Sequence, residues 1–314
     1  MNLILFDDPG IRSNLLPLTF TRPVAEVRVG ILTIAAKWER YLGAKPSYST
    51  QPQLARKFQK SLDDDNLWIN GAVCPDEKLV GVIGTLKPGD AIFKNARIIA
   101  VRTGEDELPE VIGGKVTEYA HDLAVIDQPW RIFQSNGSQI RADFRLITAG
   151  RKSAAIRDPH TRTYNEANIF LEEGVILHAA ILNAENGPIY LGKNSQVQEG
   201  AIVRGPFALG QDAIVTMGAK MRGDNTVGPY CKVGGEVSNS VLFGYSNKAH
   251  DGFLGNSVLG EWCNLGADTN TSNLKNNYDH VRVWSYTIKD FVDIGQFNCG
   301  LIMGDHSKSG INTM

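Results

Sequence analysis

The sequence lacks the features that mark disulfide frameworks, nucleic-acid binding and membrane insertion. The four cysteines Cys74, Cys231, Cys263 and Cys299 contain no C-x-x-C pair, so we interpret them as reduced packing residues. No long run of lysine or arginine occurs, and 32 basic against 34 acidic residues give a net charge of −2, which argues against nucleic acid or a membrane surface as partner. The apolar run before Asp7 is too short for a signal-peptide core, so we predict a cytoplasmic protein that acts on small molecules.

What the sequence does contain is a repeat of six residues. Counting in sixes from Leu191 to Val233 gives eight aliphatic residues without a miss: Leu191, Val197, Val203, Leu209, Val215, Met221, Val227 and Val233. An α-helix repeats at about 3.6 residues and a strand at about 2, so neither explains this period. A parallel β-helix of hexapeptide repeats does, with three hexads in each coil. Gly192, Gly210 and Gly228 each follow an anchor, where a β-carbon would obstruct the backbone.

A chain of 314 residues is long enough for two domains. We predict an α/β domain over residues 1–150 and a solenoid over 151–314, with Trp130–Thr148 as a connecting helix interrupted near Gly137. In the first domain, Asn2–Phe6 reads as a buried strand that enters a polar loop, a place where α/β domains often bind ligands.

Further elements are expected within the amino-terminal domain. Gly30–Leu42 has the apolar spacing of a helix, and Leu67–Asn70 reads as a strand. Ile92–Phe93 and Arg97–Val101 flank a short polar turn and predict a hairpin.

The six-residue period fails after Val233. Asn239 falls on the next anchor position of the count, and the register returns only at Leu259 and Leu265. Loops leave a solenoid where its period breaks, and loops commonly carry functional groups. The segment between these points contains His250, which makes it the first candidate for chemistry.

The residues around His250 resemble one family closely. The run Lys248–Gly255, followed by Asn256–Gly260, Glu261–Thr269 and Ser272-Asn273, is similar to the acetyltransferase domain of the GlmU-like proteins, bifunctional glucosamine-1-phosphate acetyltransferases and N-acetylglucosamine-1-phosphate uridyltransferases. Pro17–Pro23 resembles an R-x-x-P-L-T-x-x-x-P element of sugar-1-phosphate nucleotidyltransferases. The resemblance implies a reduced nucleotidyltransferase-like α/β domain followed by a left-handed parallel β-helix.

By this resemblance, His250 is the catalytic base that takes a proton from an amino sugar, so that its nitrogen can attack the thioester of acetyl-CoA. Asn264 and Phe253 then contact the sugar, and Asn273 and Ala267 contact acetyl-CoA. The alternative is that His250 makes only a structural hydrogen bond and that the two asparagines are ordinary corner or ladder residues.

The sequence also departs from the family. Thr216 and Gly235 stand where the family binds the substrate phosphate with an arginine and a lysine. A phosphate needs charge-assisted donors, so either the acceptor differs or other cations substitute. The candidates are Arg204, Lys220, Arg222, Lys232 and Lys248, of which we assign Arg222 and Lys248 to the substrate. The chain stops at Met314 in what reads as the middle of the solenoid, so we expect a truncated carboxyl terminus.

The amino-terminal loop departs as well. Nucleotidyltransferases of this kind hold a triphosphate on a G-x-G-T-R loop, whereas this chain has Phe6-Asp-Asp-Pro-Gly-Ile-Arg12. By position, Asp8, Arg12 and Arg22 are candidate contacts for a nucleoside triphosphate or Mg²⁺, and an ordinary surface loop is the alternative.

The leading hypothesis is a homotrimeric transferase that acetylates an amino-sugar 1-phosphate at the β-helix, with a possible nucleotidyltransferase activity in the amino-terminal domain. One alternative keeps only nucleotidyl transfer, with the solenoid as a trimerising or regulatory module. Another is a non-catalytic scaffold that binds sugar nucleotides. A zinc hydratase on the same fold would need paired histidines that the sequence does not offer, so we predict no metal site.

Overall fold

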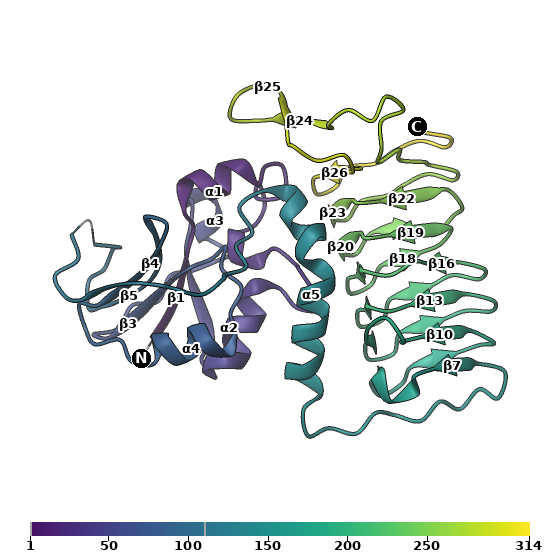
Figure 1. The fold of residues 1–314 in the computed structure, drawn as a ribbon, viewed down its shortest axis with the longest axis horizontal. Helices are drawn as coiled ribbons and strands as arrows, with labels where there is room; N and C mark the ends of the chain where they lie inside the picture. The colour runs from purple at the N-terminus through teal and green to yellow at the C-terminus, as the bar shows by residue number, and fades with distance from the viewer. Residues whose placement is uncertain (1, 110) are drawn as a thin grey trace. The chain divides into compact units, whose positions relative to one another are not determined.

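The chain forms two compact units. The computed structural model describes residues 2–109 and 111–314 (Figure 1). The first unit takes most of the chain up to Gln128, and the second takes Pro129–Met314 together with two short segments, Leu16–Leu18 and Arg28–Ile31. The boundary thus lies ahead of the division predicted at residue 150, because the helix before that point packs on the solenoid.

The first unit is built on a mixed sheet of six strands. Their order is β2 (Pro46–Ser49), β1 (Asn2–Phe6), β3 (Asn66–Asn70), β5 (Arg97–Thr103), β4 (Ala91–Lys94) and β6 (Val116–Glu118). Strand β1 runs parallel to both of its neighbours, whereas β5 is antiparallel to β3 and β4. Strand β1 lies inside the sheet, between β2 and β3, which explains its run of four buried apolar residues. Both the strand and the hairpin predicted from the sequence are confirmed.

Short helices accompany this sheet. They are α1 (Pro9–Asn14), η1 (Val24–Glu26), α2 (Ile34–Leu42), α3 (Pro52–Ala55) and α4 (Glu77–Ile83). The predicted helix over Gly30–Leu42 was too long at its start: Thr33 is the N-cap of α2, and its Oγ1 accepts a hydrogen bond from the amide of Ala36 at 3.2 Å. The loop predicted after β1 contains α1, which is capped by Asp8.

The second unit is a parallel β-solenoid with three sheets. The first sheet holds β7 (Arg162–Tyr164), β10 (Ile181–Asn183), β13 (Ile202–Arg204), β16 (Lys220–Met221), β19 (Glu236–Ser238) and β22 (Phe253–Gly255). The second holds β8 (Ile169–Leu171), β11 (Ile189–Leu191), β14 (Phe207–Leu209), β17 (Asn225–Val227), β20 (Val241–Gly244), β23 (Val258–Glu261) and β26 (Ile302–Met303). The third holds β9 (Ile176–Leu177), β12 (Gln196–Val197), β15 (Ile214–Val215), β18 (Lys232–Val233) and β21 (Asn247–Lys248), and the short helix η2 (Glu166–Asn168) precedes β8.

The predicted ladder forms the interior of this solenoid. All eight anchors from Leu191 to Val233 are at most 1% exposed. Strand pairing aligns Leu191 with Leu209 and Leu209 with Val227, which confirms a coil of eighteen residues and the hexapeptide-repeat β-helix. Cys231 and Cys263 lie in the same core, and all four cysteines are buried, as the packing interpretation requires.

Helix α5 (Pro129–Thr148) lies along the second sheet, against β14, β17, β20 and β23 (Figure 1). It runs without the interruption predicted near Gly137. A β-carbon at Gly137 would collide with the Asp224 carboxylate, so this glycine allows α5 to approach the solenoid closely instead of ending the helix.

Buried polar contacts attach Arg28–Ile31 to the same surface. The amide of Gly30 donates to Asn136 Oδ1 at 2.7 Å, the amide of Ile31 donates to Asp143 Oδ2 at 2.8 Å, and Thr226 Oγ1 donates to the Gly30 carbonyl at 2.9 Å. These hydrogen bonds hold the segment outside the helix, and Gly30 has a left-handed backbone with a φ of 80°, which is why Ile31 does not join α2.

An antiparallel hairpin interrupts the last coils. It pairs β24 (Arg282–Ser285) with β25 (Asp290–Asp293), and Trp284 packs edge-on against Phe291 at 5.4 Å between ring centroids while both remain largely exposed. No helix within the described part of the chain is both long enough and apolar enough to cross a membrane.

Candidate functional site

His250 lies on a four-residue loop, Ala249–Gly252, that joins β21 to β22. Its side chain is exposed, while the backbone of the loop is held against the solenoid. Thr216 Oγ1 donates to the Ala249 carbonyl at 3.1 Å. A β-carbon on Gly235 would come within 3.0 Å of the His250 carbonyl, so the loop rests on bare backbone. The loop therefore presents an imidazole to solvent from a fixed base.

The break in the period has a structural cause beneath this loop. Val203 pairs with Met221, eighteen residues on, but Met221 pairs with Val237, only sixteen residues on. The corner at Gly234–Gly235 is thus two residues shorter than the corner one coil earlier, and Val237 takes the anchor position instead of Asn239.

Lys248 occupies an interior position. Strand β21 aligns it with Val233, and it is 2% exposed. Its Nζ donates to the carbonyl of His250 at 2.7 Å and to that of Asp251 at 3.3 Å. Burial lowers the pKa of Lys248 to about 8, against the opposing pull of Asp251 and Asp268. This inward position differs from the outward one that the predicted contact with a substrate phosphate needs.

The predicted sugar and acetyl-CoA residues lie on the coils around and above the loop. Asn247 Nδ2 donates to Asn264 Oδ1 at 2.9 Å, which places Asn264 one coil above the strand that leads to His250. Asn273 Nδ2 donates to Asn256 Oδ1 at 2.6 Å. The Ala267 carbonyl accepts from the amide of Asn312 at 2.8 Å. The asparagines therefore do form ladder hydrogen bonds, as the structural alternative expected, and their contacts with ligands stay predictions.

Phe253 and Asn273 are brought together across Gly255. A β-carbon on Gly255 would lie 2.6 Å from Phe253 Cζ and 2.7 Å from Asn273 Nδ2. Since Phe253 follows His250 by only three residues, an aromatic face and an amide lie beside the loop on one surface.

Three cations share the outer face of the first sheet with Phe253. Register places Lys220, Glu236 and Phe253 in one column across β16, β19 and β22, with Arg204 and Arg222 in the next. Arg222 Nη1 forms an ion pair with Glu236 Oε1 at 2.8 Å, and its side chain is 62% exposed. Glu236 on the strand between thus supplies one opposite charge to this group of cations, beside Lys220 and paired with Arg222.

The residues predicted for a nucleotide have structural partners within the first unit. Asp8 Oδ1 accepts from the amides of Gly10 at 2.9 Å and Ile11 at 3.1 Å, as the N-cap of α1. Arg12 Nη2 donates to the Thr19 carbonyl at 2.9 Å. Arg22 is buried at 5% exposure. The amides that would face phosphates in a Gly-rich loop thus donate to a carboxylate of the chain itself.

The same contacts bear on Mg²⁺. Besides Asp8, the neighbouring Asp7 is buried and accepts from the amide of Val24 at 2.8 Å and from Thr50 Oγ1, and burial raises its pKa. Within residues 2–109 and 111–314, no three His, Cys, Asp or Glu side chains converge as a metal site would require. Both carboxylates of the loop thus accept hydrogen bonds from donors of the chain itself.

Replacing Asp8 tests whether it caps or binds. Asp8→Ala should lower the free energy of unfolding by about 1 kcal/mol, the usual contribution of an N-cap, whereas Asp8→Asn should change it little because asparagine caps equally well. Urea unfolding measures both. Equal losses in the two variants would show that the carboxylate charge, and not the cap, is what matters.

Sequence reasoning missed a stack of rings along one corner of the solenoid. Tyr230, Tyr245, Trp262 and His306 lie parallel, with centroids 5.1, 4.8 and 6.4 Å apart in succession. Each has a left-handed backbone, with φ between 52° and 60°. A detectable signal was available, because each of these residues follows a glycine by one or two positions.

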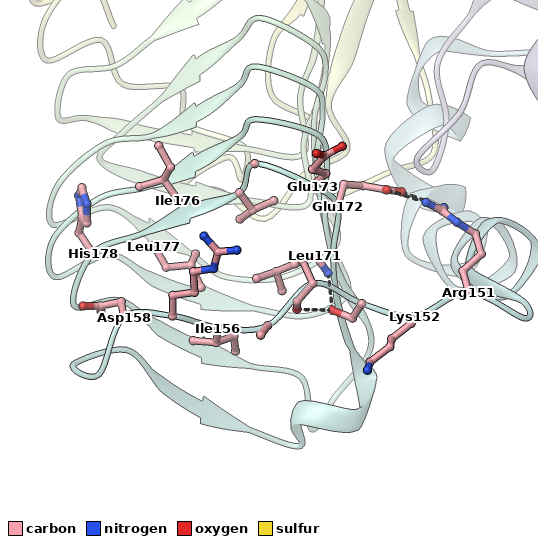
Figure 2. A pocket seen from close by; sticks show the side chains of 16 residues that line it. Arg151, Lys152, Ile156, Asp158, Leu171, Glu172, Glu173, Ile176, Leu177 and His178 are labelled. Atoms are coloured by element: carbon pink, nitrogen blue, oxygen red, sulfur yellow. Dashed lines mark hydrogen bonds and ion pairs between the residues drawn. The ribbon is translucent and has the colours of Figure 1, made fainter.

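A groove of about 850 Å³ lies at the first coil, between the segment 151–158 and β8–β9 (Figure 2). Arg151 forms an ion pair with Glu172 at 2.6 Å on one side, and His178 and Asp158 lie toward the other. The Ala154 amide donates to the Leu171 carbonyl at 2.9 Å, and Ile156 packs on the interior anchors. None of the predicted site residues lines this groove, which is where the linker covers the first coil.

Comparison with known proteins agrees with this architecture. Residues 3–152 match the family described as sugar nucleotidyl transferase. The chain is 33% identical over 93 residues to the bifunctional protein GlmU of Trichodesmium erythraeum (strain IMS101), covering 29% of this chain and 16% of that protein. It is 36% identical over 76 residues to the bifunctional protein GlmU of Methanocaldococcus jannaschii, covering 24% of this chain and 18% of that protein.

The match to the sugar nucleotidyl transferase family thus covers the mixed α/β domain and the helix after it, and a parallel β-solenoid follows. Parts of the chain are similar to two bifunctional proteins GlmU, in line with the resemblance stated from the sequence. The matched stretches span less than a fifth of each relative. The findings support a transferase.

Proposed function

We propose that the solenoid transfers an acetyl group from acetyl-CoA to the amine of an amino-sugar 1-phosphate, as a cytoplasmic homotrimer. The observation that carries the proposal is the exposed imidazole of His250 on a loop whose backbone is fixed from below. The substrate nitrogen bonds to the acetyl carbon while the thioester C–S bond breaks. The imidazole accepts the proton that the amine loses and returns it to the CoA thiolate.

The acceptor's phosphate is assigned to the cationic face formed by Arg204, Lys220 and Arg222. This face shares a sheet with Phe253, three residues from the base. Asn264 and Phe253 are assigned to the sugar, and Asn273 and Ala267 to acetyl-CoA. A trimer would bring a neighbouring solenoid against this surface, and light scattering of the purified protein tests that assembly.

An assay of CoA release tests the proposed acyl transfer. Free CoA should appear when the protein is mixed with acetyl-CoA and glucosamine 1-phosphate, and other amino-sugar phosphates extend the panel. Absence of CoA release across the panel from a trimeric preparation would reject acyl transfer.

Nucleotidyl transfer is the second candidate, favoured by the family match over residues 3–152. Pyrophosphate release from a nucleoside triphosphate and a sugar 1-phosphate measures it. The amides of Gly10 and Ile11 are engaged by Asp8, which argues against a triphosphate on this loop. Ligand-induced thermal stabilisation without either product would favour the non-catalytic scaffold.

Arg222→Ala should raise the KM for the sugar phosphate about tenfold, because a charge-assisted hydrogen bond is worth about 1.5–3 kcal/mol. The KM for acetyl-CoA should stay unchanged. Arg162→Ala is the matched control, since Arg162 lies on the same outer face at its far end. Steady-state kinetics on both variants checks the assignment, and an unchanged KM in Arg222→Ala contradicts it.

A further inference from the structure

A lysine interrupts an otherwise apolar ladder inside the solenoid. Val197, Val215 and Val233 stack in register, and the next residue in that column is Lys248, with 2% of its surface exposed. Removing an ammonium from water is unfavourable unless it finds hydrogen-bond acceptors. An aliphatic residue would fill this column more favourably, so the lysine has a role that packing alone does not explain.

The Lys248 ammonium forms hydrogen bonds with the loop that carries His250. It donates to the carbonyls of His250 and Asp251, at 2.7 and 3.3 Å. The preceding carbonyl, that of Ala249, accepts from Thr216 Oγ1 at 3.1 Å. Three consecutive carbonyls are therefore bonded to side chains of the solenoid while the His250 side chain remains exposed.

The corner directly below the loop consists of glycines, so it has no side chains that could form hydrogen bonds with the loop. The shortened corner consists of Gly234 and Gly235, whose backbone touches the loop. Above it, a β-carbon on Gly252 would collide with the Thr269 carbonyl. These contacts limit where the loop can lie, whereas the hydrogen bonds from Lys248 and Thr216 fix how its peptide planes are turned.

We propose that Lys248 is a positioning residue for acyl transfer: its ammonium holds the peptide planes of His250 and Asp251 and so aims the imidazole at the acceptor amine. This inference rests on the proposed function of His250 as the base. It assigns Lys248 to the loop backbone and not to the substrate phosphate.

The charge state of Lys248 gives the inference a pH dependence. Burial lowers the pKa of the ammonium to about 8, and the carboxylates that oppose this shift are Asp251 on the loop and Asp268 one coil above. The folded pKa lies below the unfolded value, so stability rises with pH between about 8 and the ordinary lysine range. Over the same interval the loop loses its charge-assisted hydrogen bonds, which are about twice as strong as neutral ones.

Lys248→Met fills the same column with an apolar side chain of similar length. We expect kcat for CoA release to fall at least about tenfold, with the KM for both substrates changed less than about twofold, because binding groups are untouched. The melting temperature should not fall at pH 7. Lys193→Met, an exposed lysine on the same solenoid, should leave all three quantities unchanged. A melting temperature that falls together with kcat would assign Lys248 a structural role only and overturn the inference.

Hydrogen exchange followed by mass spectrometry tests the loop without relying on activity. The amides of Gly234 and Glu236 donate to the Lys248 and Gly252 carbonyls at the two ends of the loop. In the wild-type protein, their protection, corrected for intrinsic exchange, should decline several-fold from pH 7 to pH 9. In Lys248→Met it should be low at both values. Protection that does not change with pH in the wild type overturns the inference, whether or not the variant folds. If the wild type releases no CoA, the proposed function fails, and the exchange data still decide whether Lys248 holds the loop.

Discussion

Replacing His250 with alanine is expected to lower the rate of acyl transfer by at least about 10²-fold, the lower end of what a general base contributes. The amine must lose a proton as its nitrogen attacks the thioester, and the fixed loop presents the His250 imidazole to solvent. CoA release under saturating acetyl-CoA measures the loss. Because the side chain is exposed, the melting temperature should stay within the small range typical of surface substitutions.

His178→Ala is the matched control for this variant. His178 is also an exposed histidine on the solenoid, 3.5 Å from Glu199, but lies near the first coil. It should retain full activity. Loss of activity in both variants would indicate a general effect on the solenoid, and full activity in His250→Ala would remove His250 as the base and leave the acyl-transfer proposal without its central observation.

The repeat made the solenoid predictable because an interior position in a β-helix depends on local spacing. Every sixth residue from Leu191 to Val233 faces the core whatever the rest of the chain does. The same spacing located the His250 loop, since a loop leaves the coil where the period fails. It could not reveal that Val237 replaces Asn239 as anchor, because the short Gly234–Gly235 corner makes sense only beside the loop above it.

Other features depend on contacts between distant parts of the sequence. From the sequence, Gly137 indicates a helix break, but in the structure it allows close contact with Asp224. Gly30–Ile31 fits a helical pattern, but its amides donate hydrogen bonds to Asn136 and Asp143 instead. Lys248 presented the same difficulty. A lysine beside a histidine in a loop reads as a ligand for phosphate, and only strand pairing with Val233 turns it inward.

Replacing the glycines that follow the anchors is expected to have the second large effect, a loss of stability. Gly192, Gly210 and Gly228 lack the left-handed backbone that commonly selects glycine. Glycine is required because the backbone of the next coil lies too close for a β-carbon. A β-carbon would lie 2.8 Å from the Leu209 carbonyl at Gly192 and 2.5 Å from the Pro229 nitrogen at Gly210, and at Gly228 it would be closer still to the Phe243 carbonyl. Backbone atoms of a stacked coil cannot move aside individually, so alanine must separate the coils.

Gly228→Ala is therefore expected to lower the free energy of unfolding by about 3 kcal/mol, the upper part of the range for overpacked sites. Gly210→Ala should have a smaller effect and Gly192→Ala the smallest of the three, in the order of their clashes. Denaturant unfolding followed by circular dichroism measures the series. Gly310→Ala is the control, because its β-carbon would meet only Thr313 Oγ1, at 3.9 Å. Equal losses at all four positions would mean that contact between stacked coils does not explain these glycines.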